Sequence, residues 1–400
     1  MTRLTLLLAT ATCLAVCSAR AEIQGNKIKV GVLTDMSGPF SDGVGAGSVA
    51  AARLAAQDFA AESGGIQVEI VSADHLNKPD VGSAIARGWF DQEGVSAIVD
   101  LPNSAVALAV AGLAHDRNKV ALTSSSMTSD LTGKACQPTT VQWVTDTWVQ
   151  GRSTAAGLVP QGLDRWYFLT VNYALGLSLE KDATEALVAM KGVVTGASRN
   201  PLGTTDFGTA LLQAKGSGAN VLALASTGSD MVNAIKQARE FGVTPGLAVA
   251  ALFVELSDVQ AMGLEVAQGL ELTEAFYWDL NDDTRAWSQR YATVMNGNMP
   301  TEDQAGVYSA TLAYLRAARD ARTLDGSQVV DRMKAAPFHD ALFGDVVIRK
   351  DGRAVHDMYR FRVKTPAKSR GRNDIYTQLA TIPATAAFRP LSEGGCSMLK

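Results

Sequence analysis

The chain has 400 residues, which is more than one ordinary core uses and is typical of two domains. Apolar residues make up 47 % and charged residues 19 %, so the composition is globular and excludes a disordered or fibrous chain. The formal net charge is -4, and no basic surplus indicates nucleic-acid binding.

The N-terminus has the pattern of a secretory signal peptide, assigned to residues 1–21. Arg3 supplies a positive charge, residues 4–16 are apolar, and Ala19 and Ala21 form a cleavage site of small residues. The apolar run is too short to span a membrane. We therefore predict cleavage after Ala21 and an exported mature protein without stable membrane insertion. Lipidation at Cys17 is the alternative, but the preceding residue is large where a lipidation motif has a small one.

Four cysteines occur in the sequence. Cys13 and Cys17 leave with the signal peptide, so Cys136 and Cys396 remain. Two cysteines in an oxidising compartment favour one disulfide bond. The alternative is a pair of unpaired buried thiols.

Strands and helices alternate from the start of the mature chain. The expected strands are 28–34, 68–72, 95–101 and 120–124, and the expected helices are 48–62, 81–92 and 104–115. The strands are apolar on both faces. This pattern predicts a parallel sheet covered by helices on both sides.

The alternation pauses over a polar stretch at 127–150 and then restarts. The expected strands are 166–171, 193–197, 221–225 and 247–251, and the expected helices are 148–158, 177–190, 206–216 and 229–241. Two long helices follow at 282–295 and 303–321. Segments 345–349 and 355–363 flank an Asp-Gly pair and predict a β-hairpin. The predicted fold class is α/β, with two doubly wound units.

Three patterns resemble catalytic, cofactor-binding or metal-binding motifs, but each lacks a part that the motif requires. The glycines at 43, 45 and 47 lie too far from the preceding strand for a dinucleotide fingerprint, and Ser48 stands where its last glycine belongs. Ser178 and Lys181 match an acyl-serine motif whose companion motifs are missing. The four histidines are scattered, without metal-ligand spacing. We predict no catalytic residues, no cofactor and no metal.

Two hydroxyl-rich loops follow predicted strands, at 103–104 and 123–125. In a doubly wound sheet such loops form the crevice where ligands bind. Free N–H groups at a helix start suit an anionic group. The alternative is that these side chains only cap helices.

Several segments, in this order, resemble a known family. They are KVGVLTDMSGP at 29–39, TSSSMTSDLT at 123–132, NYALG at 172–176, TDF at 205–207 and AQG at 267–269. Together they resemble the periplasmic binding proteins of branched-chain amino acid ABC importers, over residues 27 to 364. The resemblance implies the type I periplasmic binding fold, two α/β lobes joined by three crossings with the ligand between them.

The resemblance also implies domain boundaries. The first lobe would comprise 27–146 and 276–340, and the second would comprise 147–275 and 341–390. A tail at 391–400 would be tied near the crossings by Cys136 and Cys396. The Cys-x-Pro sequence at 136–138 resembles a subgroup thought to bind aromatic or other organic acids.

The ligand site that the resemblance implies draws on loops of both lobes. Its residues would be Phe40, Asn103, Ser104, Thr123, Ser124, Ser125, Tyr173, Thr227, Leu252 and Phe276. Met127 and Leu252 fall where the family binds an amino acid's ammonium group, and an ammonium without a carboxylate partner would be costly to bury. We therefore expect a small apolar carboxylate, aromatic or branched. Glu255, three residues further on, is the candidate acid should an amine bind.

The expected function is that of a periplasmic receptor that closes on its ligand and delivers it to the permease and ATPase of an ABC importer. We expect a monomer and no enzymatic activity. One alternative keeps the same machinery with a branched-chain amino acid as ligand. Others are a sensor subunit for a membrane receptor and an exported α/β enzyme.

Overall fold

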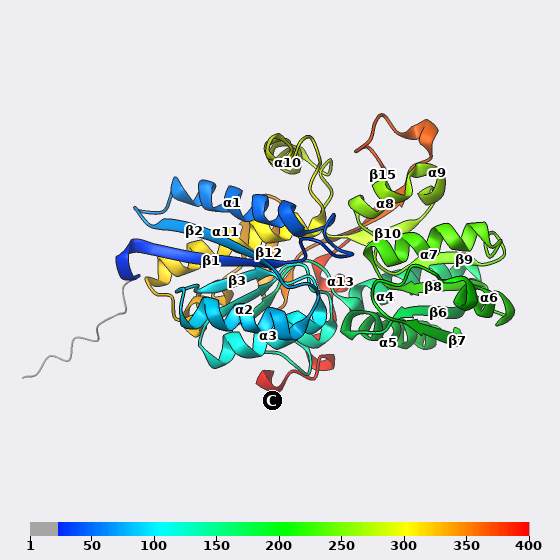
Figure 1. The fold of residues 1–400 in the computed structure, drawn as a ribbon, viewed down its shortest axis with the longest axis horizontal. Helices are drawn as coiled ribbons and strands as arrows, with labels where there is room; N and C mark the ends of the chain where they lie inside the picture. Colours follow the sequence, from blue (N-terminus) through cyan, green and yellow to red (C-terminus); the bar gives the residue numbers. More distant parts are fainter. Residues whose placement is uncertain (1–22, 400) are drawn as a thin grey trace, which may run out of the picture.

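A computed structural model describes residues 23–399. The chain forms two lobes that lie side by side along the long axis of the molecule (Figure 1). The predicted signal peptide and its cleavage after Ala21 lie outside the described residues. No helix among residues 23–399 is both long enough and apolar enough to cross a bilayer.

The first lobe is built on a five-stranded sheet in the order β2-β1-β3-β4-β5, in which all neighbours are parallel. Its strands are β1 (Lys27–Thr34), β2 (Gln67–Asp74), β3 (Ala97–Asp100), β4 (Val120–Thr123) and β5 (Thr140–Gln142). Residues 28, 30 and 32 of β1 are fully buried, as the apolar run predicts.

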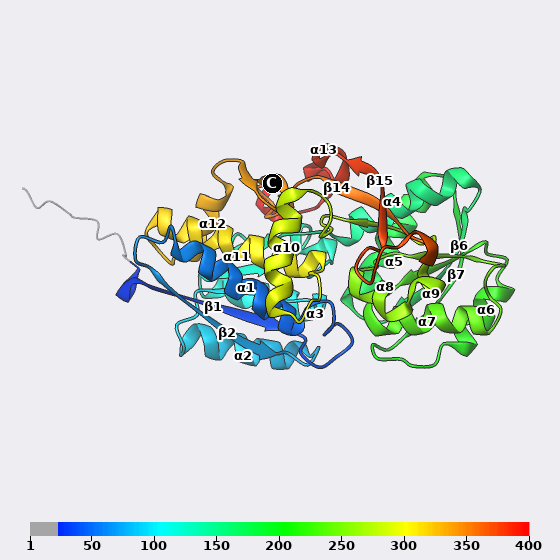
Figure 2. The ribbon, with the colours of Figure 1, turned by 90° about the horizontal axis from the view of Figure 1, so that it is seen from above.

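Helices cover both faces of this sheet (Figures 1 and 2). One face carries α1 (Gly45–Ala60), α10 (Asp282–Val294), α11 (Glu302–Ala321) and α12 (Gly326–Lys334). The other carries α2 (Pro79–Asp91) and α3 (Ser104–Asp116). The doubly wound architecture expected for this half is confirmed.

The second lobe repeats the design with a four-stranded parallel sheet in the order β7-β6-β8-β9. Its strands are β6 (Arg165–Val171), β7 (Val193–Asn200), β8 (Val221–Ala225) and β9 (Ala248–Ala251). Its helices are α4 (Thr147–Leu158), α5 (Ala174–Ala189), α6 (Gly208–Gly216), α7 (Gly228–Glu240), α8 (Leu256–Met262) and α9 (Leu264–Ala267). Parallel sheets in both lobes confirm the predicted α/β class.

The hairpin that the Asp-Gly pair predicts is confirmed between β12 (Gly344–Ile348) and the short β13 (Ala354–Val355), but the predicted second strand is divided into two. Strand β12 also pairs with β11 (Phe338–Asp340). Strand β14 (Met358–Val363) instead lies between β10 (Glu271–Glu274) and β15 (Tyr376–Ile382). The strands before and after residues 356–357 belong to different sheets, because Val346 packs in the first-lobe core and Phe361 packs in the second-lobe core.

Residues 341–355 therefore belong with the first lobe by packing, whereas the expected boundaries place them in the second. Leu342, Val346 and Ile348 share a core with α11 and α12. We propose to move the boundary to the start of β14. After β15 the chain returns once more to the first lobe, where Ala387 is buried in α13 (Ala384–Ala387). The predicted disulfide between Cys136 and Cys396 is present.

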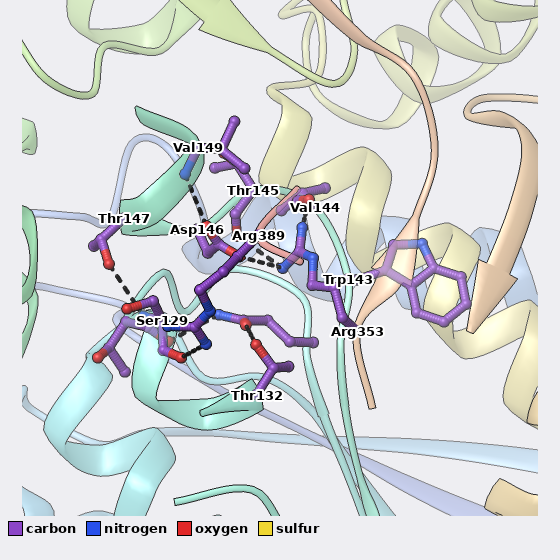
Figure 3. A network of polar contacts seen from close by, with 12 residues as sticks. Ser129, Thr132, Trp143, Val144, Thr145, Asp146, Thr147, Val149, Arg353 and Arg389 are labelled. Atoms are coloured by element: carbon purple, nitrogen blue, oxygen red, sulfur yellow. Dashed lines mark hydrogen bonds and ion pairs between the residues drawn. The ribbon is translucent and has the colours of Figure 1, made fainter. Parts of the chain in front are cut away.

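The first crossing, between β5 and α4, is held by the fully buried Arg353 (Figure 3). Its guanidinium donates to the backbone oxygens of Val144 and, at 3.1 Å, Thr145. The carboxylate of Asp146 lies 3.8 Å away and also caps α4 by accepting from the Val149 N–H. Arg353 thus fixes the backbone from which the second lobe begins.

Candidate functional site

A cavity of about 460 Å³ lies between the two lobes. It is bordered by the loops that follow β1 and β3 in the first lobe and by the start of α7 in the second. The strand order reverses between β1 and β3 in the first sheet and between β6 and β8 in the second. At such a switch point the loops at the carboxyl edge of a parallel sheet diverge and leave a crevice. Both sheets therefore direct their ligand-binding edges toward one shared space.

The lobes touch each other at the mouth of this cavity. The Ser229 N–H, at the start of α7, donates to the Pro39 carbonyl oxygen at 3.3 Å. The rings of Phe40 and Tyr173, one from each lobe, lie 6.5 Å apart between centroids. The lobes are thus closed on the cavity.

Asp35 shapes the first-lobe loop that makes these contacts. Its carboxylate accepts from the backbone N–H of Gly38 at 2.6 Å and of Phe40 at 3.0 Å, and from the Asn77 side chain at 2.8 Å. A carboxylate that gathers several N–H groups orders an irregular loop. Asp35 therefore places the Phe40 ring at the cavity.

One wall of the cavity is apolar. The contributing side chains are Phe40, Met127, Leu175, Val232 and Phe253. Most ligand pockets combine such an apolar surface with a few polar groups that set orientation. This wall suits an aromatic or branched aliphatic ligand body.

A second group of lining residues, called the acidic wall, carries carboxyl side chains. Asp42, Glu255, Asp258 and Asp303 all line the cavity, and among the described residues no Lys, Arg or His does so. Glu255 and Asp258 cap α8 reciprocally, and the Asp258 carboxylate accepts from the Glu255 N–H at 3.0 Å. Glu255 is 6 % exposed and Asp303 is 4 % exposed. Within residues 23–399, Oε1 of Glu255 and Oδ1 of Asp303 have no hydrogen-bond partner.

Burial shifts the titration of this acidic wall upward. It raises the pKa of Asp258 to about 7. The pKa values of Glu255 and Asp303 lie well above their ordinary range, first because of burial and then because of neighbouring carboxylates. A buried carboxyl without a cation retains its proton more readily.

The end of β3 is conformationally unusual. Asp100 and Leu101 adopt φ values of 85° and 62° in the left-handed region, which side-chain-bearing residues rarely occupy. Ser125 donates to the Asp100 carboxylate, and the pKa of Asp100 rises to about 6 because it is fully buried. Such strain persists where surrounding contacts fix it, often at functional sites.

The structure brings part of the expected site together. Phe40, Ser125 and Thr227 line the cavity, and Tyr173 contacts Phe40 at its edge. The other expected residues are not among its lining: Asn103, Ser104, Thr123, Ser124, Leu252 and Phe276.

Those other residues have structural roles. Asn103 caps α3 by accepting from the Ala105 and Val106 N–H groups, as the capping alternative predicted. Ser104 is fully buried, and its hydroxyl accepts from the Thr128 N–H at 3.4 Å. Thr123 donates to a neighbouring strand carbonyl, and Ser124 accepts from the Asp100 N–H. Leu252 and Phe276 are packed in the cores of the two lobes.

The expectation that the cavity holds no acidic partner for an amine is wrong. Glu255, Asp258 and Asp303 line it, although Leu252, at the position compared with the family's acid, does not. The spacing of Glu255 and Asp258 is that of a capping box, which marks a helix start in the sequence. Asp303, far away along the chain, joins them only through the fold.

A larger cavity of about 630 Å³ lies within the second lobe, beside β9 and β10. All its lining residues come from α4 and the turn that follows it, from the segments around α7 to β10, and from Arg360 of β14. Lobe closure cannot enclose a ligand there because the first lobe contributes no lining residue. The interlobe cavity is therefore the candidate site.

Comparison with a family model gives a match over residues 27–371, to a family described as periplasmic binding protein. A comparison with curated proteins gives no match.

Solved structures match over nearly the whole chain. A periplasmic binding protein from Burkholderia mallei is 39 % identical, with a TM-score of 0.90, and the match covers 94 % of this chain and 100 % of that one. A branched chain amino acid ABC transporter periplasmic ligand-binding protein from Burkholderia xenovorans LB400 is 38 % identical, with a TM-score of 0.81 and coverage of 93 % and 100 %. A solute binding protein of an ABC transporter from R. palustris, in complex with benzoate, shares the fold at 17 % identity, with a TM-score of 0.80 and coverage of 93 % and 99 %.

Proposed function

The chain belongs to the type I periplasmic binding protein family, and from that premise we propose that it is the solute receptor of an ABC importer. The family consists of periplasmic transport proteins that bind solutes and are not enzymes. In this chain the receptor captures a small molecule between its lobes and presents the closed form to a permease with its ATPase. We propose that it acts as a monomer.

One observation carries this proposal: the cavity between the lobes, closed by the contact between Pro39 and Ser229. Its volume of about 460 Å³ lies within the range of small-molecule sites. Because residues of both lobes line it, a bound solute stabilises the closed arrangement over the open one. A receptor needs this difference between two states, and no chemical step.

The apolar wall supports the aromatic or branched ligand body expected from the sequence. Phe40 and Phe253 supply rings, and Met127 supplies a flexible, polarisable side chain. Ser125 and Thr227, which also line the cavity, supply hydroxyls. The benzoate complex of the R. palustris protein shows an aromatic acid bound by the same fold, which is consistent with an organic acid here. The acidic wall favours the alternative of a ligand that carries an amine.

A ligand screen with a blocked-cavity variant tests the proposal. Small organic acids, amino acids and amines are first screened by thermal shift, and each hit is then titrated by calorimetry. Asn233 lines the cavity from α7 and is half-buried, so Asn233→Trp fills the site from a helix surface. We expect at least about tenfold weaker binding, since overfilling a packed site costs about 1–3 kcal/mol.

The matched control is Glu240→Trp, at the exposed far end of the same helix. It should bind the hit as the wild type does. Equal affinity of wild type and Asn233→Trp for every hit would place binding elsewhere and refute the receptor site.

A further inference from the structure

We infer that the larger cavity of about 630 Å³, in the second lobe, is a second binding site that takes the C-terminal end of an extended peptide, with the terminal carboxylate at Arg360. This inference goes beyond the proposed receptor function, because the two cavities share no lining residue. The ligand class is a peptide with a free carboxylate and apolar last residues.

The free edges of two strands are the first ground for the inference. Strand β9 ends the second-lobe sheet, and β10 ends the sheet of β10, β14 and β15, so each has one edge without a strand partner. Both strands line the cavity, whereas β8, on the paired edge of β9, does not. The cavity therefore lies on the free edge of β9. A free edge presents N–H and C=O groups to which an added strand forms hydrogen bonds.

Helices cover both faces of the space between these strands. On one face Ala250 of β9 shares a core with α4, and Gln150 of α4 donates to the Thr273 carbonyl oxygen of β10 at 2.8 Å. On the other face Ala251 and Leu272 share a core with α7. A segment between β9 and β10 would thus be covered on both faces, as a strand inside an α/β sheet is.

The cavity runs from the surface inward along both strands. Gln161, Pro245 and Gln268 line it and are exposed, and the last two precede β9 and β10. Ala250 and Thr273, near the other ends of these strands, are buried. A peptide that enters at the exposed side therefore brings its own end to the buried part.

Arg360 supplies a cation at the buried part. It lies opposite Thr273 in the register of β10 and β14, and it lines the cavity. Although its side chain is 37 % exposed, its Nε is buried and has no hydrogen-bond partner among residues 23–399. The carboxylate of Glu271 lies 4.0 Å from this nitrogen and is paired with Arg362 at 2.5 Å. A guanidinium binds a carboxylate through paired hydrogen bonds, so the terminal carboxylate of a peptide matches it.

The helices on the two faces favour apolar side chains in the peptide. The lining residues Ser153, Thr154 and Gly157 of α4 are small. A Cβ on Gly157 would meet only Glu271 within 4 Å, at 3.9 Å, so this surface leaves room for a side chain of the ligand. On the other face Ile235 of α7 supplies an apolar surface. Burial of apolar side chains here adds affinity to the backbone hydrogen bonds.

The test uses peptides that differ only at the groups that the inference invokes. A panel of acetylated tetrapeptides varies the last two residues among alanine, valine, leucine, phenylalanine and threonine, and thermal shift followed by calorimetry selects the tightest binder. Its C-terminal amide removes the negative charge, and a version with proline as the penultimate residue removes one N–H group. We expect saturable binding of the free acid and at least about tenfold weaker binding of each modified peptide.

A further comparison identifies the kind of molecule that supplies the peptide end. The selected tetrapeptide is titrated again as the end of a long glycine–serine chain. We expect equal affinity, because the outer residues of the cavity are exposed, and this result would assign the site to the chain ends of larger proteins. A large loss would restrict the ligand to short free peptides. Both results keep a peptide end as the ligand.

Two variants assign the binding to this cavity. Gly157→Phe places a ring in it and should weaken binding at least about tenfold, because overfilling a site is costly. Gly112→Phe, on α3 of the first lobe, is the matched control, since a Cβ there would meet nothing within 4 Å, and binding should not change. Arg360→Met should abolish the preference for the free acid over the amide. Thermal melts of the unliganded variants identify any loss of folding, and either variant alone suffices.

The outcomes separate this inference from the receptor function. Asn233→Trp, which fills the interlobe cavity, should leave peptide binding unchanged, and Gly157→Phe should leave binding of the interlobe solute unchanged. If peptide binding is lost in Asn233→Trp and kept in Gly157→Phe, the peptide is an interlobe ligand, so the receptor stands and the inference is refuted. If no peptide of the panel binds, or if the free acid and the amide bind equally, the inference is wrong whatever the interlobe solute is.

Discussion

Tyr173 carries a buried hydroxyl, and its ring lies beside Phe40, which lines the interlobe cavity. Its ring packs on Phe40 of the other lobe, and among the described residues the hydroxyl has no hydrogen-bond partner. Burial raises its pKa well above the usual value, so it remains a neutral donor. We propose that this hydroxyl donates to a ligand bound beside Phe40.

We expect Tyr173→Phe to weaken ligand binding by about 1 kcal/mol, roughly fivefold, while the free energy of unfolding stays the same or rises slightly. Calorimetry and urea titration measure the two quantities. Tyr314→Phe is the control, because this buried hydroxyl lies in the first-lobe core and not at the cavity. Unchanged affinity in Tyr173→Phe would remove the hydroxyl from the site.

Arg353 is a structural residue with a different prediction. Arg353→Met leaves the carbonyls of Val144 and Thr145 without their donor and Asp146 without its cation. We expect a loss of about 3–5 kcal/mol in the free energy of unfolding, the usual cost of breaking a buried charge pair.

Arg362→Met, on the exposed side of β14, removes only a surface ion pair with Glu271. It should cost about 0–1 kcal/mol. Urea midpoints that are the same for the two variants would show that Arg353 does not hold the crossing.

At the scale of the element, the start of α7 controls closure. Gly228 has a φ of 63°, and a Cβ there would lie 2.4 Å from the Pro39 carbonyl oxygen of the opposite lobe. Gly228→Ala should therefore hinder closure and weaken ligand binding by about tenfold or more, because backbone cannot yield as a flexible side chain does.

Gly263→Ala is the control that distinguishes an effect on lobe closure from an effect of backbone strain alone. Gly263 has a similar φ of 75°, and a Cβ there would meet nothing within 4 Å. Both variants should lose stability, and only Gly228→Ala should lose affinity. Equal affinities in calorimetry would contradict the role of this contact in closure.

The elements show what a single sequence is able to predict. Long apolar strands such as β1 and β8 and helices such as α3 and α7 were predicted within a few residues, because burial on both strand faces and helical periodicity leave a clear pattern. Strand β5 was missed because it has three residues, two of them polar or hydroxyl-bearing. The division between β13 and β14 was missed because one continuous β-rich segment contributes to two cores.

The site was harder to predict than the fold. Asn103 and Ser104 follow a strand as ligand-binding residues do, but helix caps have the same pattern, and only the hydrogen bonds distinguish the two roles. Glu255 and Asp303 are distant in the sequence, so their shared cavity appears only after the two lobes close. Residue type and spacing therefore indicate which loops form the cleft, and the fold decides which side chains face it.

At the scale of the whole molecule, the C-terminal tail ties back to the first lobe. The disulfide between Cys136 and Cys396 closes a loop of 260 positions that passes through the second lobe. Chain entropy gives up to about 5 kcal/mol of stabilisation for a loop of this length. The double variant Cys136→Ser, Cys396→Ser should lower the free energy of unfolding by up to that amount and leave affinity unchanged, because neither cysteine lines the interlobe cavity.

Non-reducing and reducing denaturant titrations of the wild type provide the complementary measurement. The reductant should lower the midpoint of the wild type and leave that of the double variant unchanged. A wild-type midpoint that is insensitive to reduction would show that the disulfide does not constrain the unfolded chain as described.

The central claim is that a small solute binds between the lobes and is held by both. Hydrogen exchange of the backbone amides, with and without a ligand from the screen, tests it most directly. Binding should slow exchange at 35–44 in the first lobe and at 226–233 and 253–258 in the second, which are the segments around the interlobe cavity. Protection confined to 153–161 and 244–250, around the larger second-lobe cavity, would contradict the claim.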